Sequence, residues 1–83
     1  QRHYSPLTPL LLVRGGALPT KGLGVYMKHG ESMPGNARDY AAALYAKLHQ
    51  LDQQGYDWIA VEEPPGEPEW AGIGDRLRRA AGR

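Results

Sequence analysis

Two short apolar runs, at residues 10–13 (Leu-Leu-Leu-Val) and 58–61 (Trp-Ile-Ala-Val), restrict what this chain can fold into more than any other feature. Each run is continuous rather than alternating, which is typical of a strand buried on both faces. A third, weaker run at residues 23–27 is diluted by Gly24. Such strands predict a mostly parallel sheet with helices beside it.

Two segments carry the spacing of amphipathic helices. In residues 37–54, Asn36 can cap the start, Asp39 is an acid in the first turn, and Gly55 can end the helix in a left-handed conformation. Residues 68–81 form the second segment, with glycines at two positions inside it. The apolar positions predicted to face inward are Tyr40, Leu44, Leu48 and Leu51 in the first helix, and Trp70, Ile73, Leu77 and Ala80 in the second.

The order strand, strand, helix, strand, helix predicts an α/β fold. We expect a small Rossmann-like three-layer domain with a mostly parallel sheet of about three strands and two main helices. The connection between Val13 and Leu23 is too short for a helical crossover, which takes a dozen residues or more. The first two strands therefore run either parallel or as an antiparallel hairpin.

Composition limits the chemistry of the chain. Its 83 residues make one domain, with 10 Lys plus Arg against 9 Asp plus Glu and a net charge of +1, so no global field recruits polyanions. There is no cysteine, and the three histidines lack metal-ligand spacing, so we expect no metal site. No apolar run is long enough for a membrane helix. We expect a soluble cytoplasmic protein without a membrane partner.

No sequence motif indicates catalysis. The Gly22-Leu23-Gly24 and Gly72-Ile73-Gly74 segments lack the third glycine of a dinucleotide-binding loop, and we interpret these residues as turn and helix-contact glycines. The acidic pair Glu62-Glu63 is interpreted as a solvated strand end, although Glu62 lies where open α/β sheets place ligands. We therefore predict no catalytic residue.

Arginines gather near the end of the second helix, at Arg76, Arg78 and Arg79. One interpretation is local, because cations favour a helix carboxyl end and Asp75 can pair with Arg78 or Arg79. The other is an interdomain or RNA contact, in which the arginines attract phosphates without reading bases.

Four segments, taken together, carry a resemblance to a known family. They are Arg2-His3-Tyr4-Ser5-Pro6, the helix at residues 40–52 with its Leu-Tyr…Leu…Leu-Asp pattern, the Ile-Ala-Val-Glu strand at residues 59–62, and the Asp-Arg-Leu-Arg-Arg-Ala-Ala ending at residues 75–81. In this order they resemble the C-terminal accessory domain of two-domain L-threonylcarbamoyladenylate synthases, which are related to the YrdC and YciO proteins.

This resemblance implies that residues 1–8 are the remnant of an interdomain linker and residues 9–83 the accessory domain. The first residue is Gln, which we expect of a domain within a longer chain. The parent enzyme would be a nucleotidyltransferase that combines L-threonine, bicarbonate and ATP, with Mg, into threonylcarbamoyl-AMP for tRNA threonylcarbamoyladenosine modification. The domain itself would be non-catalytic and hold no cofactor.

The resemblance also implies a site and partners. In relatives the linker folds over the cleft of the N-terminal catalytic domain, so Arg2, His3 and Tyr4 would form a substrate lid there. Tyr4 would shield the reaction and Arg2 would face phosphate. Besides the catalytic domain, tRNA-pathway proteins or RNA are expected partners. The alternative function is a freestanding small α/β module that binds RNA or protein through the arginine-ended helix.

Overall fold

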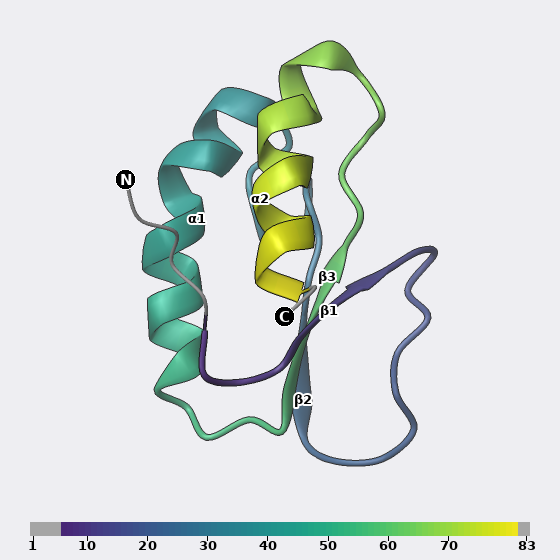
Figure 1. Cartoon of the computed structure of the whole chain (residues 1–83), viewed down its shortest axis with the longest axis vertical. Coiled ribbons are helices and arrows are strands. Elements are labelled where there is room, and N and C mark those ends of the chain that lie inside the picture. Colours follow the sequence, from purple (N-terminus) through teal and green to yellow (C-terminus); the bar gives the residue numbers. More distant parts are fainter. Residues whose placement is uncertain (1–5, 82–83) are drawn as a thin grey trace.

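The computed structural model describes residues 6–81, which form three strands and two main helices (Figure 1). In chain order the elements are β1 Leu10–Val13, β2 Gly24–Met27, α1 Ala37–Asp52, β3 Trp58–Glu62, the 3-10 turn η1 Pro68–Trp70, and α2 Ala71–Ala81. All strands are parallel, in the order β1-β3-β2. The predicted α/β fold with a parallel sheet of three strands and two helices is confirmed.

The central position of β3 decides whether the first two strands, joined by the short connection between Val13 and Leu23, form a hairpin. Because β3 pairs with both β1 and β2, the first two strands are not neighbours and form no hairpin. Residues 14–23 cross from one edge strand to the other without a helix. The continuous apolar run of β3 fits this place, since Ile59, Ala60 and Val61 are all buried.

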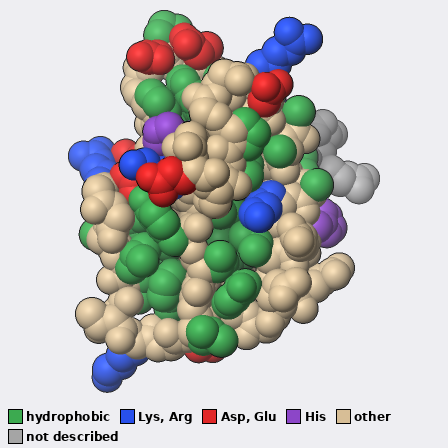
Figure 2. Space-filling view, turned by 180° about the vertical axis from the view of Figure 1, so that it is seen from behind, with side chains coloured by type: hydrophobic (Ala, Val, Ile, Leu, Met, Phe, Trp, Pro, Cys, Tyr) green, Lys and Arg blue, Asp and Glu red, His purple; other side chains and the backbone are tan. Residues whose placement is uncertain are grey.

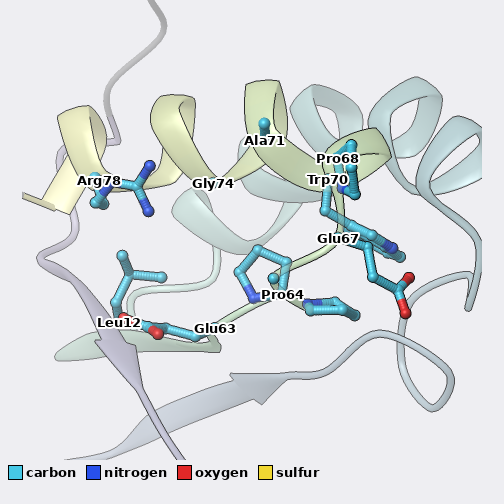
Figure 3. A pocket seen from close by; sticks show the side chains of 11 residues that line it. Leu12, Glu63, Pro64, Glu67, Pro68, Trp70, Ala71, Gly74 and Arg78 are labelled. Atoms are coloured by element: carbon cyan, nitrogen blue, oxygen red, sulfur yellow. The ribbon is translucent and has the colours of Figure 1, made fainter.

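The core lies between one face of the sheet and both helices. Strand residues that share this face by register contribute to a single apolar cluster with the inward residues of α1 and α2. The strand members are Leu10, Leu12, Val25, Met27, Ile59 and Val61. Both helices therefore cover the same face, and Figure 3 shows them together above the strands. The described residues form two layers of secondary structure where three were expected.

Within residues 6–81, no helix packs on the opposite face of the sheet. There the indole of Trp58 lies over Gly24, where a Cβ would overlap the ring, and its Nε1 donates to the carbonyl oxygen of Lys21 at 2.9 Å. Viewed from this side, apolar side chains gather in the lower half of the molecule (Figure 2). Gly24 is thus a packing glycine, which agrees with the structural interpretation of the Gly22-Leu23-Gly24 segment.

Both helices begin as their sequences indicate. The Asn36 side chain accepts a hydrogen bond from the Asp39 amide at 2.9 Å, which is the predicted cap of α1, and Gly55 follows the helix with a φ of 80°. The second helical segment starts at Pro68 but makes one 3-10 turn before α2. Trp70 in that turn is buried, with its ring 5.2 Å from that of Tyr40. Within residues 6–81, neither helix is long and apolar enough to cross a membrane.

Candidate functional site

The leading segment of the chain is fastened to the end of α1 by one carboxylate. Asp52 Oδ1 accepts hydrogen bonds from the Thr8 hydroxyl at 2.6 Å and the Thr8 amide at 2.8 Å, while Oδ2 accepts from the Leu7 amide at 3.0 Å. In Figure 1 the chain passes beside the lower end of α1 before turning into β1. Residues 7 and 8, predicted as part of a linker remnant, are therefore held against the domain.

Burial around this attachment differs sharply between neighbours. Thr8 is 8% exposed and is the one buried polar residue in the described part of the chain, and Pro6 is buried too. Leu7, between them, is 94% exposed. Pro9 follows, and its carbonyl oxygen accepts from the Ile59 amide at 2.9 Å as the chain enters the sheet. The segment is thus anchored from Pro6 into β1, with one large apolar side chain turned outward.

Sequence analysis did not predict that Asp52 holds the segment that leads into β1. A signal was present, because an acidic side chain at a helix carboxyl end opposes the helix dipole and is disfavoured by about 0.3–1 kcal/mol unless something offsets it. Here three donors offset that cost. The predicted lid residues Arg2, His3 and Tyr4 lie outside the described residues, so their role stays a prediction.

The three arginines of α2 do not share one face. Successive residues turn by about 100° around a helix, so Arg76 and Arg78 point to roughly opposite sides. Arg76 lines a shallow hollow beside Arg38 and Ala41 of α1, whereas Arg78 lines a pocket on the strand side. Arg79 pairs with Asp75 at 3.0 Å, as the local interpretation predicted. Arg76 and Arg79 lie about 60° apart around the helix, so a phosphate backbone that met these two would approach Arg78 from a different direction.

Arg78 closes one end of a pocket between α2 and the loop that follows β3. The pocket has a volume of about 350 Å³, and Figure 3 shows Arg78 above Leu12 at one end of it, Pro64 in the middle, and Glu67 and Trp70 at the other end. Glu63, also in its lining, pairs with Arg14 at 2.9 Å. The walls are mainly proline, glycine and apolar groups, so the pocket offers contacts to a ligand but no activated nucleophile.

Glu62, at the carboxyl end of the central strand, is used by the chain itself. Its carboxylate accepts from the amides of Gly15 at 2.6 Å and Gly16 at 2.9 Å, and from the Tyr26 hydroxyl at 2.7 Å. The hydrogen bond from Tyr26, followed by those from the two glycines, lowers the pKa of Glu62. Both glycines have positive φ angles, 61° and 70°, a conformation that other residues rarely adopt. The carboxylate therefore fastens the 14–23 connection to the sheet.

The remaining polar groups of residues 6–81 form no cluster that could hold a metal ion. Across residues 6–81, no three His, Asp or Glu side chains are grouped so that they could hold a metal ion. The first turn of α1 is capped by the side chain of Asn36. Asp57, like Asp52 and Glu62, accepts from a distant backbone amide, that of Leu23 at 2.8 Å. These three carboxylates therefore join distant segments of the chain through hydrogen bonds to backbone amides.

A comparison with known families identifies the group to which this arrangement belongs. Residues 1–82 match the family model described as threonylcarbamoyl-AMP synthase, C-terminal domain. The chain belongs to this family. Searches among curated proteins and solved structures returned no match. The resemblance drawn from the four sequence segments is thereby confirmed for nearly the whole chain.

Membership of the threonylcarbamoyl-AMP synthase C-terminal family gives the observed contacts a context. The match begins at residue 1, so it includes the Arg2-His3-Tyr4 segment as well as the folded domain. Asp52 ends the Leu-Tyr…Leu…Leu-Asp segment, and Glu62 ends the Ile-Ala-Val-Glu segment, on which the resemblance rested. Both acids bind backbone amides more than 40 residues away. Two segments that resemble the family thus end in residues that fasten the domain together.

Proposed function

We propose that this chain is the non-catalytic accessory domain of a threonylcarbamoyl-AMP synthase that acts in tRNA threonylcarbamoyladenosine modification. The observation that carries the proposal is the family match over residues 1–82. The parent protein would be a nucleotidyltransferase that joins L-threonine, bicarbonate and ATP into threonylcarbamoyl-AMP. ATP and Mg would be bound by an N-terminal catalytic domain, the main partner of this one.

The proposed contribution of this chain is to carry a lid. Arg2, His3 and Tyr4 precede the anchored segment and would extend over the catalytic cleft. A ring there would exclude water from an intermediate that hydrolyses readily, and a cation would contact phosphate. The hydrogen bonds of Asp52 to residues 7 and 8 support this proposal, because they give the lid a fixed base on the domain.

The use of the acidic side chains supports a non-catalytic role. General acid–base chemistry needs carboxylates held in unlike environments around a cleft. Asp52, Asp57 and Glu62 instead accept hydrogen bonds from the chain's own amides. Binding of tRNA-pathway proteins or RNA through Arg76, Arg78 and Arg79 remains a separate proposal, and the divergent directions of Arg76 and Arg78 weigh against a single phosphate-binding face. We propose the cytoplasm as the compartment, and a chain without cysteine suits its reducing conditions.

Two measurements test the proposed function. Titration calorimetry of the isolated chain with ATP and Mg should show no binding, and micromolar affinity would contradict an accessory role. In the two-domain enzyme, Tyr4→Ala should lower the yield of threonylcarbamoyl-AMP per ATP consumed, because water reaches the intermediate. Leu7→Ala is the matched control, since it shortens an exposed apolar side chain of the same segment. Wild-type yield in Tyr4→Ala would contradict the lid.

A further inference from the structure

The carboxyl ends of β1 and β3 lie side by side, and the chain leaves these two strands toward opposite faces of the sheet. Side chains alternate along a strand, so Glu62, next to the inward Val61, belongs to the outer face. Its carboxylate holds the amides of Gly15 and Gly16, so the 14–23 connection leaves β1 on that outer face. The chain that follows β3 enters α2, which packs on the inner face. Open α/β sheets bind ligands in the crevice where neighbouring strands send their connections to opposite faces.

A pocket lies at this crevice, on the helix side of the sheet. It is lined by Leu12 near the end of β1, by the loop that follows β3 and by α2 (Figure 3), and its volume is about 350 Å³. Small-molecule sites typically have volumes of about 300–1,000 Å³. Residues 64, 65 and 68 of the loop are proline, whose fixed φ stiffens this wall, and the Trp70 amide donates to the Glu67 carbonyl oxygen at 2.9 Å. The pocket is therefore largely formed before a ligand binds.

Arg78, in the last turn of α2, is the cation of this pocket. No Asp or Glu within residues 6–81 forms an ion pair with it. Asp75, the local partner that the sequence offered, pairs with Arg79 at 3.0 Å. Glu63, which also lines the pocket, pairs with Arg14 at 2.9 Å. A guanidinium binds a carboxylate or a phosphate through two parallel hydrogen bonds, so Arg78 presents to a ligand the donors that no acid of the described chain uses.

Gly74 makes room for this cation. A glycine inside a helix destabilises it relative to alanine, and Gly74 is a buried residue of α2. A Cβ at this position would lie 3.3 Å from Nη1 of Arg78, closer than an ordinary contact. The guanidinium thus lies against the helix backbone one turn before its own Cα, on the side where Gly74 also lines the pocket.

The lining indicates the class of ligand. Arg78 lies at one end, Pro64 in the middle, and Glu67 at the other end (Figure 3). An apolar cavity of about 150 Å³ holds a benzene ring, so the larger volume here has room for a ring-sized body beside a charged head. The carboxylate of Glu67 disfavours a second negative group at the far end, because like charges repel.

We propose that this pocket binds a small organic anion, with one carboxylate or phosphate head on Arg78 and an apolar body against the proline-rich loop. The site is separate from the proposed accessory role and does not depend on the lid. Binding needs no other domain, because every residue that lines the pocket belongs to this chain.

Nuclear magnetic resonance titration of the chain tests the site with two probes, benzoate and phenyl phosphate. At millimolar concentrations at least one should shift the amide signals of Glu63, Gly66, Glu67, Gly74 and Arg78, and the tighter of the two identifies the preferred head. Benzyl alcohol, which lacks the charge, and inorganic phosphate, which lacks the ring, should each bind about ten-fold more weakly or less. Absence of these shifts with both probes would overturn the proposal, as would equal affinity for either control compound.

Arg78→Gln should weaken binding of the preferred probe by about ten-fold or more, because it removes the charge and the paired donors. Arg79→Gln is the matched control, since it removes the same charge from the neighbouring residue, whose guanidinium pairs with Asp75. Arg78→Lys keeps the charge without the paired donors and should give an intermediate loss. Equal weakening in Arg78→Gln and Arg79→Gln would show an effect of net charge and overturn the site. None of these outcomes depends on the yield of Tyr4→Ala, so failure of this site and failure of the proposed function are distinguishable.

Discussion

At the scale of single residues, the contact between Gly24 and Trp58 makes a direct prediction. A Cβ at position 24 would overlap the indole ring, so Gly24→Ala must displace Trp58 from the outer face of the sheet. Overpacking of this kind costs about 1–3 kcal/mol in the free energy of unfolding. Gly72→Ala is the control, since a Cβ there meets nothing within 4 Å and alanine favours the helix by up to about 1 kcal/mol. The free energy of unfolding, measured with denaturant, should therefore fall in Gly24→Ala and rise in Gly72→Ala. Equal stability of Gly24→Ala and wild type would contradict the contact.

The Tyr26–Glu62 hydrogen bond predicts a dependence on pH. This bond, with burial and the charge of the same carboxylate, raises the pKa of Tyr26 from 10.0 to about 12. Between these values the unfolded chain has lost the phenol proton while the folded chain keeps it, so Tyr26 contributes stability below pH 10 that is lost as pH rises toward 12. In Glu62→Gln, absorbance titration should show the pKa of one tyrosine falling. An unchanged titration would contradict the bond.

Glu62 predicts the opposite behaviour in acid. Because its pKa in the folded chain lies below the ordinary value of 4.5, its contribution to stability is present above that value and disappears as pH falls through the lowered pKa. Wild type should therefore lose more stability than Glu62→Gln between pH 5 and the acid limit of folding, measured by denaturant unfolding at each pH. Parallel pH profiles for the two proteins would count against the carboxylate as the fastening group of residues 14–23.

At the scale of elements, the two tryptophans lie on opposite sides of the sheet, Trp70 in the core and Trp58 on the outer face. Trp70, the last residue of η1, is 3% exposed and packs against Tyr40 of α1, so Trp70→Ala should cost about 3–5 kcal/mol and detach the start of α2. Trp58 lies on the outer face and is only partly buried, so Trp58→Ala should cost less. Thermal unfolding of the two variants tests the order. A midpoint for Trp70→Ala equal to that of wild type would show that the last helix is not docked as described.

Elements whose signals are local could be predicted from the sequence, and those that depend on distant partners could not. Asn36 and Asp39 lie three residues apart, so the cap of α1 is visible in the sequence, as are the buried strands. The covering of the sheet on one face only, and the place of β3 between β1 and β2, depend on which surfaces meet. Asp52 and Glu62 bind amides 44 to 47 residues away, a separation that leaves no periodic pattern.

At the scale of the whole molecule, the folded domain holds residues 7 and 8, which lead into β1, through hydrogen bonds to α1. α1 packs in the core against the sheet and α2, and Asp52 is its last residue. Asp52 in turn accepts hydrogen bonds from residues 7 and 8. Every step in this series is a contact within the described residues, and the proposed lid residues Arg2, His3 and Tyr4 precede Pro6 in the sequence. Under the proposed accessory role, this arrangement would give the linker a fixed base on the domain.

The most direct test of the proposed function compares threonylcarbamoyl-AMP synthesis by the two-domain enzyme with synthesis by a catalytic domain that ends at Ser5, which retains the proposed lid residues but lacks the domain that follows them. Misplaced catalytic groups cost up to about a hundred-fold in rate, so we predict that the shortened enzyme loses about ten- to a hundred-fold in product formation while still binding ATP. Adding residues 6–83 as a separate chain should not restore the rate. Full synthesis by the shortened enzyme, or full restoration by the separate chain, would contradict the account.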